Sequence, residues 1–279
     1  MTPREYYAIN SDSLGKDAAI PMEKLPSSEA VFEKMALEMI DLIEVNNEAG
    51  EKTVFILPVG PVGQYPVFVR EVNERNLSLK DCWFINMDEY LNGDNTYIDI
   101  DSPLSFRGFM NREVYNKIKP ELLMPEKQRV FPDPVNPERV DILLKELGYA
   151  DICFGGIGLD GHIAFNEPMP KLKLKKFMAL PTRIVEISLE TKVTNGIAEL
   201  GGAIDMMPKK AITLGMKSIL ASKKIRLGVF RDWHKGVCRR AAYGDVTPEF
   251  PATVIQKHSD AMIYVNDVAA ELPFESKAV

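Results

Sequence analysis

The chain has 279 residues, of which 46% are apolar and 27% charged, a composition that excludes a disordered, collagen-like or disulfide-scaffold protein. It carries 34 Lys and Arg against 40 Asp and Glu, and this net charge of −6 disfavours general binding to nucleic acid or to an anionic membrane. Three cysteines without CxxC spacing and an N-terminus without an apolar segment indicate a soluble, cytoplasmic protein.

Helix and strand signals alternate along the chain. A helix is predicted between an N-cap signal at 27–29 and the stop signal of Asn46, Asn47 and Gly50. Short apolar runs of the kind found in strands buried on both faces follow at 54–57, 82–85, 152–154, 225–230 and 261–265, with helices predicted between them over 67–76, 104–118, 137–147 and 233–243. This alternation predicts one α/β domain over 1–279, a mainly parallel open sheet with helices on both faces.

The segment 166–182 differs in composition from its surroundings. Pro168, Pro170 and Pro181 flank a lysine-rich run at 171–176, so no regular helix is expected at either end of the segment. The lysines are expected to be exposed to water. The segment is predicted to be either a lid over a site or an exposed edge strand protected by lysines, and the composition supports both equally.

In open parallel sheets, ligands bind beyond the carboxyl ends of the strands, so the residues after each predicted strand are the candidates for a site. Acidic residues follow two of these strands, and the second group adds a histidine. They are Asp88 and Glu89 after one strand, and Asp160, His162 and Glu167 after the other. A base, an acid that works near neutral pH and a group that orients it are what proton transfer requires.

Asp160 and His162 are two residues apart, so in an extended loop their side chains point the same way. A carboxylate that is hydrogen-bonded to one ring nitrogen fixes the tautomer of the imidazole and raises the basicity of the other ring nitrogen. Glu167 is near enough in the sequence to complete a relay. The alternative is that Asp160 caps a turn and His162 is structural, but the surrounding glycines favour function. Asp88 and Glu89 could equally be a solvated acidic pair or a helix cap.

Residues 156–161 match the pattern GxGxxG, which in dinucleotide-binding proteins opens a long helix. Pro168 and Pro170 leave little room for such a helix, and no strand ending in an acidic residue follows about twenty residues later. The match is therefore interpreted as accidental, and no cofactor is expected. The three histidines are far apart and no HExxH motif occurs, so the sequence gives no support for a metal site.

Two motifs resemble those of the glucosamine-6-phosphate deaminase (isomerase) family: 86–90, Asn-Met-Asp-Glu-Tyr, and 156–168, which ends in Ala-Phe-Asn-Glu-Pro. Weaker similarity extends through 105–110, 191–195 and 211–216. The related 6-phosphogluconolactonases share the fold and a Gly-x-Gly-x-Asp-Gly-His core, but their motif continues differently. The resemblance implies a Rossmann-like fold of the deaminase/isomerase type.

The resemblance also implies catalytic roles. Asp88 would move a proton between C2 and C1 of the open-chain sugar, His162 would open the pyranose, and Asp160 and Glu167 would orient His162. The implied reaction converts glucosamine 6-phosphate or galactosamine 6-phosphate to a ketose 6-phosphate and ammonia, with no metal or organic cofactor. The implied substrate contacts are Gly60, Val62, Gly63, Glu89, Gly158, Gly161 and Lys235. Family membership further implies a lid at 166–182 and, often, a homo-oligomer.

One loop departs from the family pattern. Where the family usually reads Thr-Gly-Ser-Thr-Pro, residues 59–63 read Val-Gly-Pro-Val-Gly, so two hydroxyls are gone and Pro61 has no N–H. The family's phosphate-binding arginine aligns with Ile197, although Lys235 matches its phosphate lysine. Either the lysines of 171–176 or Arg183 supply the missing charge, or the substrate is an unphosphorylated or differently substituted amino sugar; the loop favours the second.

Two other functions compete with the deaminase. A lactonase on the same fold would use His162 to activate water and would have no need of Asp88 as a carbon base. A sugar-binding regulator could keep the fold without turnover, but it would have no need of Asp88, Asp160, His162 and Glu167 together.

Overall fold

The computed structural model describes residues 1–274 and contains a sheet of seven strands in the order β1-β10-β9-β6-β2-β3-β5. Their bounds are β1 (Met22–Leu25), β10 (Ala261–Asn266), β9 (Lys224–Val229), β6 (Ile152–Gly155), β2 (Thr53–Leu57), β3 (Cys82–Asn86) and β5 (Arg129–Val130). Every neighbouring pair is parallel. The predicted α/β fold with a mainly parallel sheet is therefore confirmed.

The inner strands of the sheet are buried on both faces because they are mostly apolar on both faces. In β2, Val54 and Ile56 pack into one core, while Phe55 and Leu57 pack into the core on the other side. Removal of such side chains from water on both faces is the main driving force for this fold. It also explains why continuous apolar runs located β2, β3, β6, β9 and β10 correctly.

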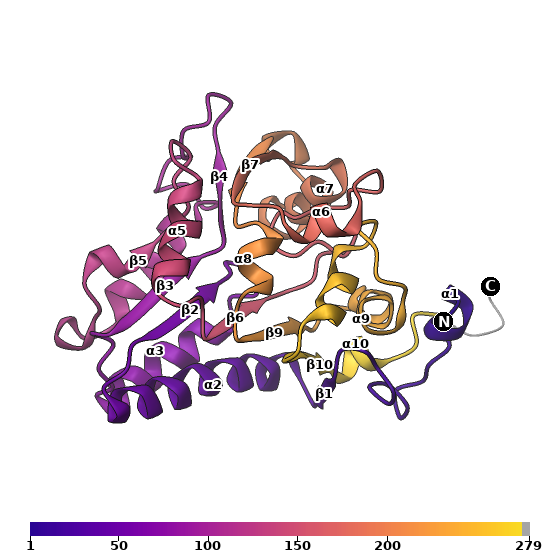
Figure 1. The fold of residues 1–279 in the computed structure, drawn as a ribbon, viewed down its shortest axis with the longest axis horizontal. Coiled ribbons are helices and arrows are strands. Elements are labelled where there is room, and N and C mark those ends of the chain that lie inside the picture. Colours follow the sequence, from indigo (N-terminus) through magenta and orange to yellow (C-terminus); the bar gives the residue numbers. More distant parts are fainter. Residues whose placement is uncertain (275–279) are drawn as a thin grey trace.

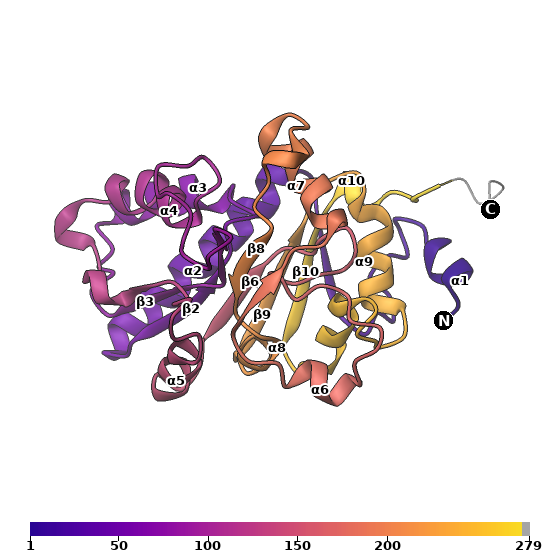
Figure 2. The same ribbon diagram turned by 90° about the horizontal axis from the view of Figure 1, so that it is seen from above.

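Helices cover both faces of the sheet (Figure 1). One face carries α2 (Ser28–Ala49) and α3 (Gln64–Arg75), and the other carries α5 (Glu138–Glu146), α8 (Met216–Leu220) and α9 (His234–Tyr243). The remaining helices are α1 (Pro3–Tyr7), α4 (Phe106–Glu113), α6 (Leu174–Met178), α7 (Leu189–Leu200) and α10 (Asp267–Ala270). Helix α1 packs against α9, at the opposite end of the molecule from β3 (Figure 2).

The first long helix begins and ends where the sequence signals predict. The Ser27 hydroxyl accepts a hydrogen bond from the Ala30 N–H at 3.2 Å, and Gly50 ends α2 in the left-handed conformation with φ of 68°. The predicted helix at 104–118 is shorter than expected. It ends at Glu113, because Val114 leaves the helical conformation and a 3₁₀ turn follows at Tyr115–Lys117.

A second, three-stranded antiparallel sheet rises from the carboxyl edge of the first, in the order β4-β8-β7. Its strands are β4 (Asp88–Leu91), β8 (Lys210–Thr213) and β7 (Arg183–Glu186). The sequence analysis did not predict it, because these four-residue strands mix charged and apolar side chains and form no long apolar run. Figure 1 shows β4 and β7 above the main sheet.

The segment 166–182 contains the short helix α6 and no strand, so the edge-strand interpretation is wrong. Phe177 is fully buried in the main core, and the Thr182 N–H and hydroxyl both donate to Asp141 of α5. The lysines around them are exposed, as predicted. No helix in the described part of the chain has the length and hydrophobicity of a membrane span.

Candidate active site

A cavity of about 400 Å³ lies at the carboxyl edge of the main sheet. It is lined by the loops that follow β2, β6 and β9, by the start of β4, by residues 103–109 and by one face of α7. Its position beyond the carboxyl ends of parallel strands is where open α/β sheets bind ligands. Of the described residues that line it, none comes from 166–182, and the lid remains a prediction.

Asp88 is the first residue of β4 and lines the cavity, yet only 6% of it is exposed. Burial raises the pKa of its carboxyl well above the usual range, and the nearby charge of Glu89 raises it further. A buried carboxyl with a raised pKa can take a proton from substrate and return it near neutral pH. This is the property required of a base that moves a proton between two carbons.

His162 also lines the cavity, and Asp160 holds it from behind. Asp160 Oδ1 lies 2.6 Å from His162 Nδ1 and also accepts the His162 backbone N–H at 3.2 Å. Burial alone would raise the pKa of Asp160, but these contacts with His162 outweigh it and lower the pKa. The side chains therefore meet as their spacing predicts, and Nε2 is the ring nitrogen left for a ligand.

Gly158 allows this arrangement of the histidine ring. A Cβ at Gly158 would lie 2.0 Å from His162 Cε1, so the imidazole packs directly on the glycine backbone. Gly158 itself lines the cavity, as do Gly60, Val62 and Gly63 of the loop after β2. These four predicted substrate contacts therefore share one cavity with Asp88 and His162.

Glu167 lies behind the histidine and is held by the start of α7. Its carboxylate accepts the Ser188 backbone N–H and hydroxyl, both at 2.9 Å. The Thr191 hydroxyl lies 3.4 Å from His162 Nδ1, which continues the polar cluster. Asp160, His162 and Glu167 offer ligand atoms within 4.8 Å of one another, so they could hold a cation, but each already has a protein partner.

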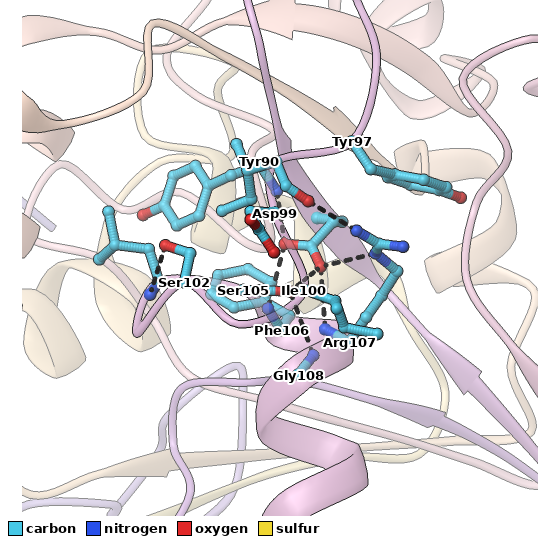
Figure 3. A network of polar contacts seen from close by, with 12 residues as sticks. Tyr90, Tyr97, Asp99, Ile100, Ser102, Ser105, Phe106, Arg107 and Gly108 are labelled. Carbon is cyan, nitrogen blue, oxygen red and sulfur yellow. Dashed lines mark hydrogen bonds and ion pairs between the residues drawn. The ribbon is translucent and has the colours of Figure 1, made fainter.

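Glu89, predicted as a substrate contact, is fully buried, does not line the cavity and caps α4. Figure 3 shows the residues at the start of α4 that it contacts, Ser105, Phe106 and Arg107. The Glu89 oxygens accept the Phe106 and Arg107 N–H groups at 3.1 and 2.8 Å and the Ser105 hydroxyl at 3.1 Å. Arg107 Nε adds an ion pair at 3.3 Å, and its guanidinium stacks 4.1 Å from the centre of the Tyr97 ring. Of the interpretations left open by the sequence, the helix cap describes Glu89.

Two further predicted contacts lie outside the cavity lining. Lys235 Nζ is paired with Asp232 at 2.6 Å and Glu271 at 3.0 Å. Gly161 turns the loop with φ of 83° and packs against Phe250. The sequence analysis had placed both beside the substrate by resemblance, and the structure does not bring them there in this conformation.

Strand β8 connects Asp88 with the loop that carries His162, although it contains neither residue. Thr213 pairs with Asp88 across the β4–β8 ladder, and its hydroxyl accepts the Phe165 backbone N–H at 3.1 Å. The Leu214 N–H donates to the Met87 carbonyl at 2.7 Å. Strand β8 therefore fixes the position of Asp88 and the position of the His162 loop relative to each other.

Sequence reasoning missed the residues that close the other end of the cavity. They are Phe32 of α2 and Phe230, Arg231, Trp233 and His234 after β9. The position of the last four after a parallel strand was a usable signal, whereas Phe32 comes from a helix face. His234 has both ring nitrogens engaged, because Nδ1 accepts the Phe230 and Arg231 N–H groups and Nε2 lies 3.0 Å from the Ile157 carbonyl.

No protein-family model matches the chain. It is 32% identical over 214 residues to the glucosamine-6-phosphate deaminase of Clostridium botulinum (strain Alaska E43 / Type E3), covering 76% of this chain and 81% of the relative. Glucosamine-6-phosphate deaminase 1 of Bacillus subtilis (strain 168) is 31% identical over 214 residues, covering 76% of this chain and 83% of the relative.

Solved structures give the same result for the fold. A monomeric glucosamine-6-phosphate deaminase superposes with a TM-score of 0.77 at 28% identity, covering 89% of this chain and 98% of that one. A 6-phosphogluconolactonase from Shewanella baltica OS155 superposes with a TM-score of 0.61 at 14% identity, covering 88% and 97%. The second likeness shows a shared fold alone.

Proposed function

Since the chain belongs to the glucosamine-6-phosphate deaminase family, we propose that it isomerises and deaminates an amino sugar. The substrate is a 2-amino-2-deoxyhexose of the gluco or galacto series, or its 6-phosphate, and the products are a ketose and ammonia. The observation that carries this proposal is that buried Asp88 and the Asp160-backed His162 line the same cavity. The proposal includes no metal and no organic cofactor.

In the proposed reaction, His162 takes the proton from the O1 hydroxyl and delivers it to the ring oxygen, which opens the pyranose, while Asp160 fixes the orientation of the imidazole. Asp88 then takes the proton from C2 of the open-chain aldose and returns it to C1. The aldehyde oxygen gains a proton and the amine loses one in the same isomerisation, so C1 becomes a hydroxymethyl group and the C2 amine becomes an imine. Water then adds across the C=N bond, ammonia leaves and the ketone remains. The carbonyl at C1 acidifies the C2 proton, so a carboxylate is a sufficient base.

Asp88→Asn tests the proposal directly. Because the amide cannot accept the C2 proton, ammonia release in a coupled assay is expected to fall by about 10² to 10⁴-fold. In heavy water the wild type should place deuterium at C1 of the ketose, and the variant should not. Undiminished ammonia release by Asp88→Asn would contradict the role of Asp88.

The same variant separates the competing functions. A lactonase that uses His162 to activate water would keep its hydrolysis of 6-phosphogluconolactone in Asp88→Asn. A sugar-binding regulator would be stabilised against heat by a sugar and would release no ammonia in any form. The deaminase alone loses ammonia release with this single change.

Glu89 is proposed as a positioning residue, because its carboxylate fixes α4 directly beside the Asp88 backbone. Lys235 and Gly161 remain proposals as substrate contacts, as does the lid at 166–182. A cytoplasmic location and assembly into a homo-oligomer also remain proposals carried by the family resemblance.

A further inference from the structure

Building on the proposed function, we propose that the end of the cavity that receives C6 of the sugar takes an uncharged group in place of a phosphate. The preferred substrates are then 2-amino-2-deoxyhexoses whose C6 is a hydroxymethyl or a methyl group. Three observations support an uncharged group. This end is lined mainly by apolar side chains, its backbone N–H groups already donate within the protein, and the family lysine is paired with carboxylates.

The proposed reaction suggests a direction for the sugar in the cavity. We place C1 and C2 at Asp88 and the ring oxygen at His162, as that reaction requires, and C6 at the part of the same cavity that the loops following β2 and β9 line. These loops adjoin the loop after β6, because a Cβ on Gly156 would lie 3.1 Å from Pro61 Cδ. The C6 end is therefore formed by three loops and by α2, which lies beneath them.

The C6 end is lined mainly by apolar side chains: Phe32, Pro61, Val62, Phe230 and Trp233. The rings of Phe32 and Phe230 pack edge to face with centroids 4.7 Å apart. Aromatic faces and aliphatic groups suit the C–H surface of a sugar, whereas a phosphate dianion needs charge-assisted donors.

The backbone donors at this end are used by the protein itself. Consecutive N–H groups form the kind of concave donor site that binds anions, and Phe230 and Arg231 present such a pair. Both N–H groups donate instead to His234 Nδ1, at 2.9 and 2.8 Å. Burial lowers the pKa of His234 to about 3, so the ring is neutral and Nε2–H donates to the Ile157 carbonyl. The imidazole therefore uses the two donors that an anion at this point would need.

The start of α3 is shielded as well. Its preceding loop contains Pro61, which has no N–H, and Gly63 is covered by the ring of Phe32, since a Cβ on Gly63 would lie 2.2 Å from that ring. The family lysine, Lys235, is paired with two carboxylates outside the cavity. Among the described lining residues, Arg231 is the one Lys or Arg, and the exposed Glu199 lines the same cavity.

The test compares sugars that differ only at C6. Ammonia release by the wild-type enzyme is measured with glucosamine, 6-deoxyglucosamine and glucosamine 6-phosphate, and with their galacto epimers. At this site a phosphate would lack charge-assisted hydrogen bonds, each of which is worth about tenfold or more in affinity. The kcat/KM for the better uncharged sugar should therefore exceed that for its 6-phosphate by about tenfold or more. An equal or higher kcat/KM for the 6-phosphate overturns the proposal.

Two variants should move this preference towards phosphate. His234→Ala frees two N–H groups and should raise kcat/KM for the 6-phosphate relative to the uncharged sugar by about tenfold. Val62→Ser adds one hydroxyl and should act in the same direction with a smaller effect. Val135→Ser is the matched control, because Val135 is 82% exposed and outside the cavity lining. If His234→Ala fails to fold, Val62→Ser decides; an unchanged preference in the folded variants overturns the proposal.

A binding experiment separates this proposal from the proposed function. Asp88→Asn is titrated by calorimetry with each sugar and with inorganic phosphate. Preferential binding of an uncharged sugar without turnover in the wild type would end the proposed function and leave the C6 inference standing. Tighter binding of the 6-phosphate or of phosphate itself overturns the inference and leaves deamination intact. If none of these ligands binds, both are overturned.

Discussion

The two ends of the cavity each contain a histidine, and the two rings are used in opposite ways. At the end proposed for catalysis, Asp160 holds Nδ1 of His162, and Nε2 is the nitrogen proposed to meet the substrate. At the C6 end, His234 has both nitrogens engaged by backbone groups of its own chain. The chemical use of a histidine therefore depends on which of its nitrogens the fold leaves without a partner, and not on its presence in a cavity.

Removing the support of the catalytic histidine should give the largest effect. Asp160→Asn cannot hold the imidazole as a charged partner, so kcat for deamination of the best substrate is expected to fall by about 10² to 10⁴-fold. Steady-state ammonia assays measure this. The exposed Asp245→Asn is the control and should leave kcat unchanged. A loss confined to KM would show that Asp160 only helps to bind the sugar.

The Glu89 network tests whether the catalytic end is held in place by α4. Glu89→Gln removes the buried charge that accepts from Ser105, Phe106 and Arg107, and should lower the free energy of unfolding by about 2–4 kcal/mol. Denaturant unfolding measures it, with the exposed Glu249→Gln as control. A positioning role also predicts a fall in kcat with little change in KM in the folded variant; unchanged kcat would leave Glu89 a purely structural cap.

The pH dependence of stability tests the burial of Asp88. Its folded-state pKa is raised, so the proton contributes stability that is complete below the ordinary value of 3.8 and is lost as pH rises through the raised pKa. The stability of the wild type relative to Asp88→Asn should therefore fall over this range, measured by denaturant unfolding at several pH values. A difference that stays constant with pH would contradict the raised pKa. The kcat/KM of the wild type should rise over the same interval, as the base loses its proton.

The smallest effect is expected at the exposed cation of the C6 end. Arg231→Gln should change kcat/KM for an uncharged amino sugar by at most about fivefold, because an exposed charge interacts weakly through water. The kcat/KM of Arg231→Gln relative to the wild type is measured at low and at high salt, because salt screens the interaction of an exposed charge. A large loss of kcat/KM for the 6-phosphate alone would show that Arg231 binds the phosphate. The C6 end would then use a charged side chain for its substrate, as the other end does.

The sequence predicted five of the seven strands of the main sheet because these are buried on both faces and are mostly apolar. It did not predict β1 and β5, which lie at the edges of the sheet and are only partly buried. It predicted the contact of Asp160 with His162 because that contact is local, two residues apart in one loop. It did not predict the second sheet, because β7 and β8 are short and partly polar and their pairing depends on distant contacts. Phe32 could not be placed in the cavity from its helical spacing, which specifies a buried face but not its neighbours.

The dependence of both acid–base motifs on β8 has a consequence for how the enzyme is made. During synthesis the base and the histidine loop leave the ribosome before Lys210–Thr213, the strand that aligns them. An amino-terminal fragment would thus contain all four acid–base residues and still be inert. Under the proposed function, ammonia release by a split chain would therefore show that the carboxyl-terminal portion has docked.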